Sequence, residues 1–389
     1  EPETIKVGIL HSLTGTMAIS ESSVVDASMM AIDEINLSGG LLGRQIEVVK
    51  YDGRSDWPTF ARGAKSLIVD HKVDVVFGCW TSASRKTVKP IFERYDHLLF
   101  YPVQYEGLEQ SENIIYTGST PNQQILPAVK WSLANLGPRV YLASSDYVFP
   151  RAANTLIKQQ LAALGGQLVG EAYINLGSTQ VKAMVEDIKK SRADLILNTI
   201  NGDSNIAFFQ QLADAGVSTP TMSFSIAEDE LQSIKVDTSV DHYAAWSYFQ
   251  SLPTPVNQAF VTRFKGKFGA HRTTNASVAA AYAGVYLWAD AVRQAQSSDT
   301  HFVREALKGM SMDAPEGQVW ISATNNHLWK PLHIGQVKTD GQFEILWSEE
   351  QVIRPLPYPG YRNRQSWHGF LDALYRGWGG HWAAENEGA

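Results

Sequence analysis

Short apolar runs alternate along the chain with segments in which apolar residues recur every three or four positions. Residues 5–10 form the first run and predict a strand of the kind found in parallel sheets. Residues 21–36 form the first helical segment, and Gly39 and Gly40 follow it as a C-cap would. The alternation then continues with predicted strands at 45–52, 74–79, 98–102 and 114–118 and predicted helices at 59–71 and 82–95. This order predicts a parallel sheet with right-handed crossovers.

A second set of the same kind follows. Its predicted helices are 121–136, 150–164, 181–190 and 205–215, and its predicted strands are 139–145, 167–174, 194–200, 221–225 and 242–249. Helices at 255–268, 275–295 and 301–307 come next, then strands at 318–321, 332–338 and 343–347. Asp340 and Gly341 indicate a hairpin turn between the last two strands. Two successive sets of similar size predict an α/β protein with two doubly wound lobes.

Composition narrows the function classes. The chain has 389 residues, enough for two domains, and its net charge of −7 disfavours nucleic acid as a partner. No apolar stretch is long enough to span a membrane. Cys79 is the single cysteine, so neither an intrachain disulfide nor a cysteine-based metal site is expected. The start at Glu1, with no Met or leader, is typical of a processed N-terminus.

The familiar catalytic motifs are missing from the sequence. The chain has no phosphate-binding P-loop, no His-Glu-x-x-His zinc motif, no nucleophile elbow and no glycine-rich dinucleotide turn after the first strand. Its ten histidines are scattered. We therefore predict no catalytic residues, no metal and no cofactor.

Aromatic and small polar residues gather instead at the carboxyl ends of the predicted strands. Ligands of open α/β sheets bind at that edge, and a mixture of flat apolar walls with a few polar groups is typical of a small-molecule pocket. The loops concerned are 79–86, 101–106, 145–150, 198–203 and 225–228. The candidate ligand-binding residues are Trp80, Ser82, Tyr101, Pro102, Val103, Gln104, Tyr147, Phe149, Asp203 and Glu228.

Each candidate also has a purely structural interpretation. The aromatic residues fit a core, Ser82 and Asp203 fit helix N-caps, and Glu228 fits the first turn of a helix. Arg85 and Lys86 are expected to make surface pairs, and Cys79 to be a small buried apolar residue. The functional interpretation depends on all five loops sharing one rim.

These loops belong to longer motifs that resemble a known family. The chain opens with Ile5-Lys6-Val7-Gly8-Ile9-Leu10 and Leu13-Thr14-Gly15, and continues through 36–44. Over residues 5–360 it resembles a type I periplasmic substrate-binding protein of an ABC importer. Within that family, stretches 78–86, 101–107, 121–124, 145–151 and 314–317 resemble the urea and short-chain-amide branch, and 198–203 and 325–330 are most similar to urea receptors.

Two departures distinguish the branches. Amide receptors tend to have Tyr in place of Trp80 and Thr-Pro in place of Val103 and Gln104, so the sequence favours urea. The resemblance implies a three-strand hinge between lobe 1 (4–121 with 251–330) and lobe 2 (122–250 with 331–353). The stretch 354–389 is rich in Pro, Gly and aromatic residues, which predicts an irregular tail. It also implies an ABC permease with its ATPase subunits as partners and a periplasmic or extracytoplasmic location, with anchoring through a removed N-terminal segment left open.

The chemistry of urea can be matched to the candidates. Urea is planar and neutral, with one strong acceptor and four N–H donors. Trp80, Tyr101 and Tyr147 would supply walls, and Ser82 with the adjacent helix start would meet the oxygen. The acceptors for the N–H groups would be Gln104, Asp203, Glu228 and the backbone carbonyls near 101–103. At about −1.5 kcal/mol per heavy atom, four atoms limit Kd to tens of micromolar.

Other functions remain open on sequence alone. The same fold would serve a receptor for short-chain amides or branched-chain amino acids, and Glu228 with Ser82 could hold an α-amino acid. A cytoplasmic amide-sensing regulator of this fold is a further alternative. A hydrolase of urea or amides would need an activated nucleophile or a metal, and the motifs indicate neither.

Overall fold

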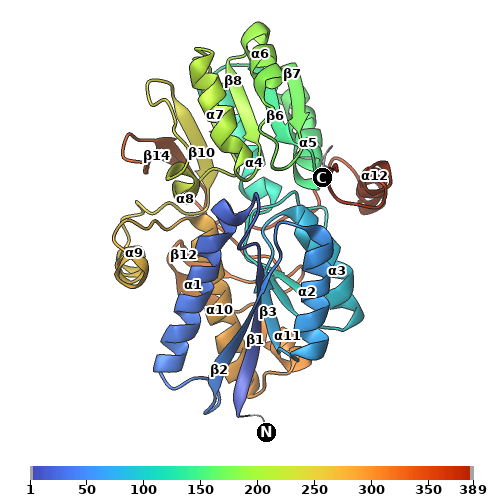
Figure 1. Ribbon diagram of the computed structural model, residues 1–389, viewed down its shortest axis with the longest axis vertical. Coiled ribbons are helices and arrows are strands. Elements are labelled where there is room, and N and C mark those ends of the chain that lie inside the picture. Colours follow the sequence, from blue (N-terminus) through green and yellow to red (C-terminus); the bar gives the residue numbers. More distant parts are fainter. Residues whose placement is uncertain (1–2, 386–389) are drawn as a thin grey trace. The chain divides into compact units, whose positions relative to one another are not determined.

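The computed structural model describes residues 3–385, and the chain divides into two compact units (Figure 1). Unit 1 consists of Glu1–Gln104, Glu109–Ser119 and Leu252–Lys330, and unit 2 of Tyr105–Leu108, Thr120–Ser251 and Pro331–Ala389. Apart from the short segment Tyr105–Leu108, which belongs to unit 2, the chain crosses from one unit to the other three times. Within the described residues, no helix is both long enough and apolar enough to cross a membrane.

Unit 1 is built on a parallel sheet with the strand order β2-β1-β3-β4-β5. Every neighbouring pair is parallel, and the register places Leu10 of β1 beside Gly78 of β3. β3, β4 and β5 are buried throughout, which agrees with the continuous apolar runs that predicted them. The strands are β1 (Thr4–His11), β2 (Gln45–Asp52), β3 (Val75–Gly78), β4 (Leu99–Tyr101) and β5 (Ile114–Tyr116).

Helices cover both faces of this sheet (Figure 1). α1 (Ala18–Leu37) packs against α10 (Ala276–Ala295) on one face, and α2 (Trp57–Lys65) packs against α3 (Ser82–Arg94) on the other. α10 also contacts β3 and β4, so this helix packs on the sheet of unit 1. The remaining elements of unit 1 are the π-helical turn Ser66–Asp70, α9 (Pro255–Phe268), α11 (Thr300–Leu307) and the antiparallel pair β11 (Ser311–Ala314) and β12 (Gly317–Trp320).

Unit 2 contains a seven-stranded sheet with the order β14-β13-β10-β9-β8-β6-β7. Five strands are parallel, which confirms the predicted α/β class, but β13 and β14 are antiparallel additions. The hairpin turn predicted between β13 and β14 forms at Gly341, where φ is +78°, and β13 also pairs antiparallel with β10. The strands are β6 (Arg139–Ser145), β7 (Gln167–Ile174), β8 (Leu195–Thr199), β9 (Thr221–Ser223), β10 (His242–Trp246), β13 (His333–Val337) and β14 (Phe343–Ser348).

One predicted helix of unit 2 is interrupted in the structure. The segment predicted as one helix over 121–136 is a 3-10 turn, Pro121–Gln123, followed by α4 (Ile125–Asn135). The break falls at Gln124, whose φ of −140° and ψ of −71° are not helical. The other helices are α5 (Val148–Leu164), α6 (Lys182–Ser191), α7 (Ser204–Asp214), α8 (Glu228–Leu231) and α12 (Arg364–Gly377).

α12 corrects the expectation that the C-terminal tail is irregular. The Asn363 side chain caps this helix by accepting the backbone N–H of Ser366 at 2.8 Å. Trp367 and Leu371, four residues apart, bury one face of the helix. Residues 386–389 of the predicted tail lie outside the described residues.

Candidate functional site

In unit 1 the turn that follows β3 presents Trp80. Cys79 has φ +67°, a left-handed backbone that few non-glycine residues adopt, and this turn redirects the chain away from the strand. Trp80 is buried, and its carbonyl accepts the Tyr101 hydroxyl at 2.7 Å. The two aromatic candidates of unit 1 are therefore held together. Cys79 is fully buried, and burial raises the pKa of its thiol, so it is an apolar residue as expected.

The helix that begins at Ser82 is capped by its neighbour. Thr81 is the N-cap of α3, and its hydroxyl oxygen accepts the N–H of Ser84 at 3.1 Å. The N-cap interpretation of Ser82 is therefore wrong, because Ser82 is already the first helical residue. The Ser82 hydroxyl instead accepts a hydrogen bond from Nη1 of Arg85 at 3.2 Å.

Arg85 and Lys86 belong to a buried charge cluster that the sequence did not predict. Nε of Arg85 lies 3.0 Å from Glu109, and Nζ of Lys86 lies 2.8 Å from the same carboxylate. The expected surface pairs are wrong, because Arg85 is 0% and Lys86 8% exposed. Tyr116 also donates its hydroxyl to Glu109 at 2.5 Å, and the guanidinium of Arg85 lies 4.8 Å from the ring centre of Tyr101. The cluster thus fixes both Ser82 and Tyr101 in place.

Pro102, Val103 and Gln104 follow β4 and are all buried. A glycine in the adjacent segment of the same chain allows the backbone of these residues to pass close to it. A Cβ at Gly118 would lie 2.1 Å from the carbonyl carbon and oxygen of Val103, so only glycine fits there. The backbone carbonyls expected to serve as acceptors thus lie in a tightly packed segment.

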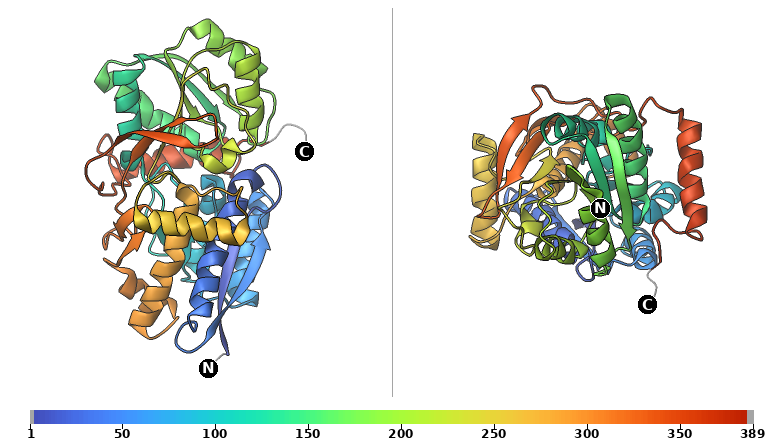
Figure 2. Two further views of the ribbon diagram at one scale, coloured as in Figure 1. Left: turned by 90° about the vertical axis from the view of Figure 1, so that its left-hand side faces the viewer. Right: turned by 90° about the horizontal axis from the view of Figure 1, so that it is seen from above.

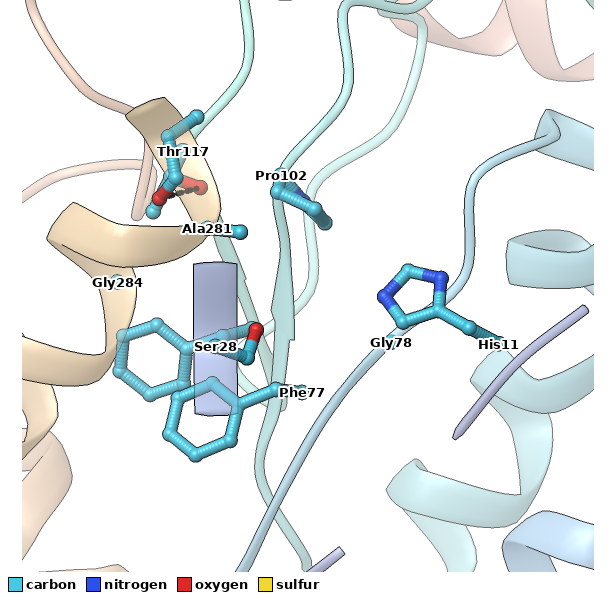
Figure 3. Close-up of a pocket in the computed structure, with 10 residues that line it drawn as sticks. His11, Ser28, Phe77, Gly78, Pro102, Thr117, Ala281 and Gly284 are labelled. Carbon is cyan, nitrogen blue, oxygen red and sulfur yellow. Dashed lines mark hydrogen bonds between the residues drawn. The ribbon is translucent and has the colours of Figure 1, made fainter. Parts of the chain in front are cut away.

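A small cavity lies beneath this segment, between the sheet and the pair α1 and α10 (Figure 3). It has a volume of about 10 Å³ and is lined by Pro102, Phe77 and Ala281 among others. His11 and Ser28 face it, and neither Nε2 of His11 nor Oγ of Ser28 has a hydrogen-bond partner among the described residues. Nδ1 of His11 pairs with the buried Glu21 at 2.8 Å. The space fits one water molecule, not an organic ligand.

In unit 2 the loop after β6 presents Tyr147, which is 1% exposed. Its hydroxyl accepts a hydrogen bond from Nδ2 of Asn201 at 2.5 Å, and the backbone N–H of Asn201 donates to Ser145 at 3.0 Å. Oδ1 of Asn201 is buried, and no described residue donates to it. Asn201 was not a predicted site residue, although it lies in one of the five predicted loops.

Phe149 and Asp203 differ in exposure. Phe149 is 2% exposed and lies in the first turn of α5, with its ring centre 6.3 Å from that of Tyr147. Asp203 precedes α7 and is exposed, and its side chain does not cap that helix. By position Asp203 is nevertheless the N-cap residue of α7, as one interpretation of the sequence predicted.

Glu228 begins α8, after β9, and its side chain is fully buried. Oε2 accepts the backbone N–H of Gln250 at 2.6 Å, whereas Oε1 has no partner within residues 3–385. Burial raises the pKa of Glu228 to about 8, and the nearby carboxylates of Glu230 and Asp229 also raise it. The hydrogen bond from the Gln250 N–H lowers the pKa but does not offset burial. At pH 7 this carboxyl group is therefore mostly protonated.

Each unit thus gathers its candidates at the carboxyl edge of its own sheet. Trp80, Ser82, Tyr101 and the 102–104 segment belong to unit 1, and Tyr147, Phe149, Asp203 and Glu228 to unit 2. β9, β8 and β6 are neighbours in the sheet order, so the loops of Glu228, Asn201 and Tyr147 are adjacent. Across the part of the chain that is described, no group of three or more His, Cys, Asp or Glu side chains could hold a metal ion.

Comparison with protein families gives one match that covers nearly the whole chain. The family described as "Periplasmic binding protein domain" matches residues 5–364. Among solved structures, the solute-binding protein of an ABC transporter from Rhodopseudomonas palustris HaA2, in complex with p-hydroxybenzoic acid, superposes with a TM-score of 0.81. It is 24% identical, and the match covers 92% of this chain and 100% of that one. The similarity confirms the type I periplasmic binding protein fold.

Two relatives are matched over very different fractions of their own length. The leucine-, isoleucine-, valine-, threonine- and alanine-binding protein of Pseudomonas aeruginosa is 24% identical over 327 residues, which cover 82% of this chain and 85% of the relative. A limonene hydroxylase of Geobacillus stearothermophilus is 35% identical over 116 residues. The latter match covers 30% of this chain and only 21%, about a fifth, of the relative.

Proposed function

Because the chain belongs to the periplasmic binding protein domain family, whose fold is that of solute-binding receptors and not of enzymes, we propose that it is the substrate-binding receptor of an ABC importer. It captures urea in the periplasm by hinge closure and delivers it unaltered to a membrane permease with its ATPase subunits. The importer assignment is supported by the amino-acid-binding relative of Pseudomonas aeruginosa and by the solved structure described above.

The observation that carries the choice of ligand is a pair of buried polar oxygens in unit 2. Oε1 of Glu228 and Oδ1 of Asn201 are buried without a partner among the described residues, and their loops are adjacent at the sheet edge. A buried polar atom without a hydrogen bond is costly, so it favours a ligand that supplies one. Urea is uncharged and offers four N–H donors and one carbonyl acceptor, so it can donate to Asn201 and accept from the protonated carboxyl group of Glu228.

The protonation state of Glu228 supports a neutral ligand over an amino acid. A carboxyl group with a pKa of about 8 is mostly uncharged at pH 7 and can both accept and donate a hydrogen bond. An ammonium group would instead be stabilised by an ionised carboxylate, and ionising Glu228 in its buried position costs free energy.

Unit 1 would supply the complementary half of the site. Its buried indole and phenol rings, Trp80 and Tyr101, provide flat walls. Ser82, whose hydroxyl accepts from Arg85, is polarised to donate to the ligand oxygen. We propose that hinge closure brings these groups over a ligand bound to Tyr147, Asn201 and Glu228, and excludes water from it.

Calorimetry with a panel of solutes tests this proposal. We expect urea to bind with a Kd of tens of micromolar or weaker, whereas leucine and 4-hydroxybenzoate should not bind. Short-chain amides such as acetamide and formamide are the second candidate, favoured because the same acceptors match their N–H groups. Binding of leucine without urea would refute the proposal, and steady release of ammonia from urea would overturn the receptor assignment itself.

A variant of Glu228 separates a neutral ligand from a charged one. Glu228→Gln keeps a donor and an acceptor, so we expect urea affinity to fall by less than about tenfold, the equivalent of one neutral hydrogen bond. Glu186→Gln, at an exposed position of α6 in the same unit, is the matched control and should leave affinity unchanged. A much larger loss in Glu228→Gln would indicate that the ligand carries a positive charge.

A further inference from the structure

We propose that residues 364–385 form a C-terminal strap that positions Tyr147 for ligand binding. This inference deepens the proposed function and rests on it, because it assigns a role to a segment outside the predicted ligand contacts. The family match ends at residue 364, the first residue of α12, so the rest of α12 and the residues after it lie beyond the matched part of the chain.

The strap pairs with the backbone on both sides of Tyr147. The N–H of Val148 donates to the carbonyl of Trp382 at 3.0 Å, and the N–H of Ala384 donates to the carbonyl of Asp146 at 3.0 Å. Tyr147 and Ala383 are thus directly opposite each other in an antiparallel bridge. These bonds hold the backbone of Tyr147 in an extended conformation, with φ −153° and ψ −176°.

The tyrosine is therefore held at two points. Its side-chain hydroxyl is held by Asn201, and its backbone by the strap. A third bond, from Nδ2 of Asn175 to the carbonyl of Glu385 at 2.9 Å, ties the end of the strap to the segment that follows β7. A side chain fixed in this way loses less conformational entropy when a ligand binds to it.

α12 anchors the strap to the body of unit 2. The helix packs against α5, the helix that begins directly after Tyr147 (Figures 1 and 2). Trp367 is fully buried, and the guanidinium of Arg362 lies 4.7 Å from the centre of its ring. The ring of Trp382 lies 4.8 Å from that of Tyr375, which connects the end of α12 to the paired residues.

A glycine also allows close approach of the chain that leads into the strap. A Cβ at Gly107, where φ is +66°, would lie 2.6 Å from the carbonyl oxygen of Pro357. The adjacent N–H of Leu108 donates to that same oxygen at 2.7 Å. The chain is thus attached to unit 2 just before the strap, and the strap is attached through α12 and after it, which distinguishes it from a loose terminus.

Removing one hydrogen bond tests the positioning role. Ala384→Pro deletes the N–H that bonds to Asp146, whereas Ala384→Gly, the matched control, keeps it. A chain that ends after His381 removes the paired residues but keeps α12, and a chain that ends after Glu385 is its control. Two readouts are measured for each: hydrogen–deuterium exchange of the peptide containing Tyr147 and Val148 without ligand, and Kd for urea.

We expect Ala384→Pro and the chain ending at His381 to exchange faster at this peptide and to bind urea about tenfold more weakly. Both controls should behave as the original chain does. Unchanged exchange, or faster exchange with unchanged urea affinity, would overturn the proposal. If the original chain binds no urea while exchange still responds to the strap variants, the proposed function fails and the contact between strap and loop is supported.

Discussion

At the scale of single residues, the buried charges of unit 1 are the feature that the sequence least revealed. Burial alone would raise the pKa of Glu109, but Arg85 and Lys86 together hold it below its usual range. The sequence places Arg85 and Lys86 on a predicted helix, where surface pairs were expected. Their actual partner, Glu109, is more than twenty residues away along the chain. Only the fold brings the three together.

Removing the anion from this cluster should destabilise the protein strongly. Glu109→Gln leaves two buried cations without their counter-charge, which we expect to lower the free energy of unfolding by about 3–5 kcal/mol. Glu93→Gln is the control, because Glu93 forms only an exposed pair with Lys89, worth about 0.5 kcal/mol. Guanidinium unfolding curves measure both. Equal effects of the two variants would contradict the interpretation of the cluster as a structural support.

The raised pKa of Glu228 predicts a dependence of stability on pH. The folded protein holds this proton up to about pH 8, whereas the unfolded chain releases it near its ordinary value of 4.5. The stabilisation is therefore complete below pH 4.5 and is lost as pH rises through 8, with a slope of at most about 1.4 kcal/mol per unit.

Guanidinium unfolding between pH 6.5 and 8.5 measures this effect. His242, which is buried, and His333, which is half-buried, each have a pKa lowered to about 4 and still gain protons on unfolding near pH 6.5, but both proteins contain them, so the difference between the two slopes reports Glu228. We expect stability to fall toward pH 8 in the original chain and to change less in Glu228→Gln. Identical slopes in the two proteins would show that Glu228 is ionised in the folded state.

At the scale of elements, close backbone contacts hold the candidate loops. The predicted strands and most predicted helices agree with the structure, because apolar periodicity reports burial directly. The exceptions are local. Gln124 interrupts a predicted helix, and α12 forms where Pro, Gly and aromatic content had suggested irregular structure. In α12 only two buried positions, Trp367 and Leu371, carry the apolar face.

A pair of glycine substitutions tests the importance of one such contact. Gly118→Ala would place a Cβ 2.1 Å from the backbone of Val103, so we expect a loss of stability of more than about 2 kcal/mol and weaker urea binding. Gly266→Ala, inside α9 with no atom within 4 Å of the new Cβ, should stabilise the protein by about 0.5–1 kcal/mol. Thermal unfolding and calorimetry measure both variants, and a tolerated Gly118→Ala would contradict the close packing.

At the scale of the whole molecule, specific binding of urea predicts opposite effects of the same solute at two concentrations. At about one hundred times Kd, a few millimolar, bound urea should stabilise the folded state by about 2.7 kcal/mol. For units of this size that raises Tm by roughly 5–10 °C, whereas molar urea denatures the protein as usual.

Small-angle scattering measured on the same samples tests closure separately from binding. We expect the radius of gyration to decrease at millimolar urea and to stay constant with equal concentrations of leucine. A rise in Tm without any decrease in the radius of gyration would support binding but refute closure.

The sequence by itself determined the α/β class, the two successive sets of elements and the loops that carry the candidate residues. These features depend on local periodicity and on motifs, which a single chain displays. Only the tertiary structure decided that Arg85 and Lys86 are buried with Glu109, that Asn201 holds Tyr147, and that the C-terminal tail pairs with the Tyr147 loop. Those contacts join residues far apart in the sequence, and hydrogen bonds between them leave no periodic pattern along the chain.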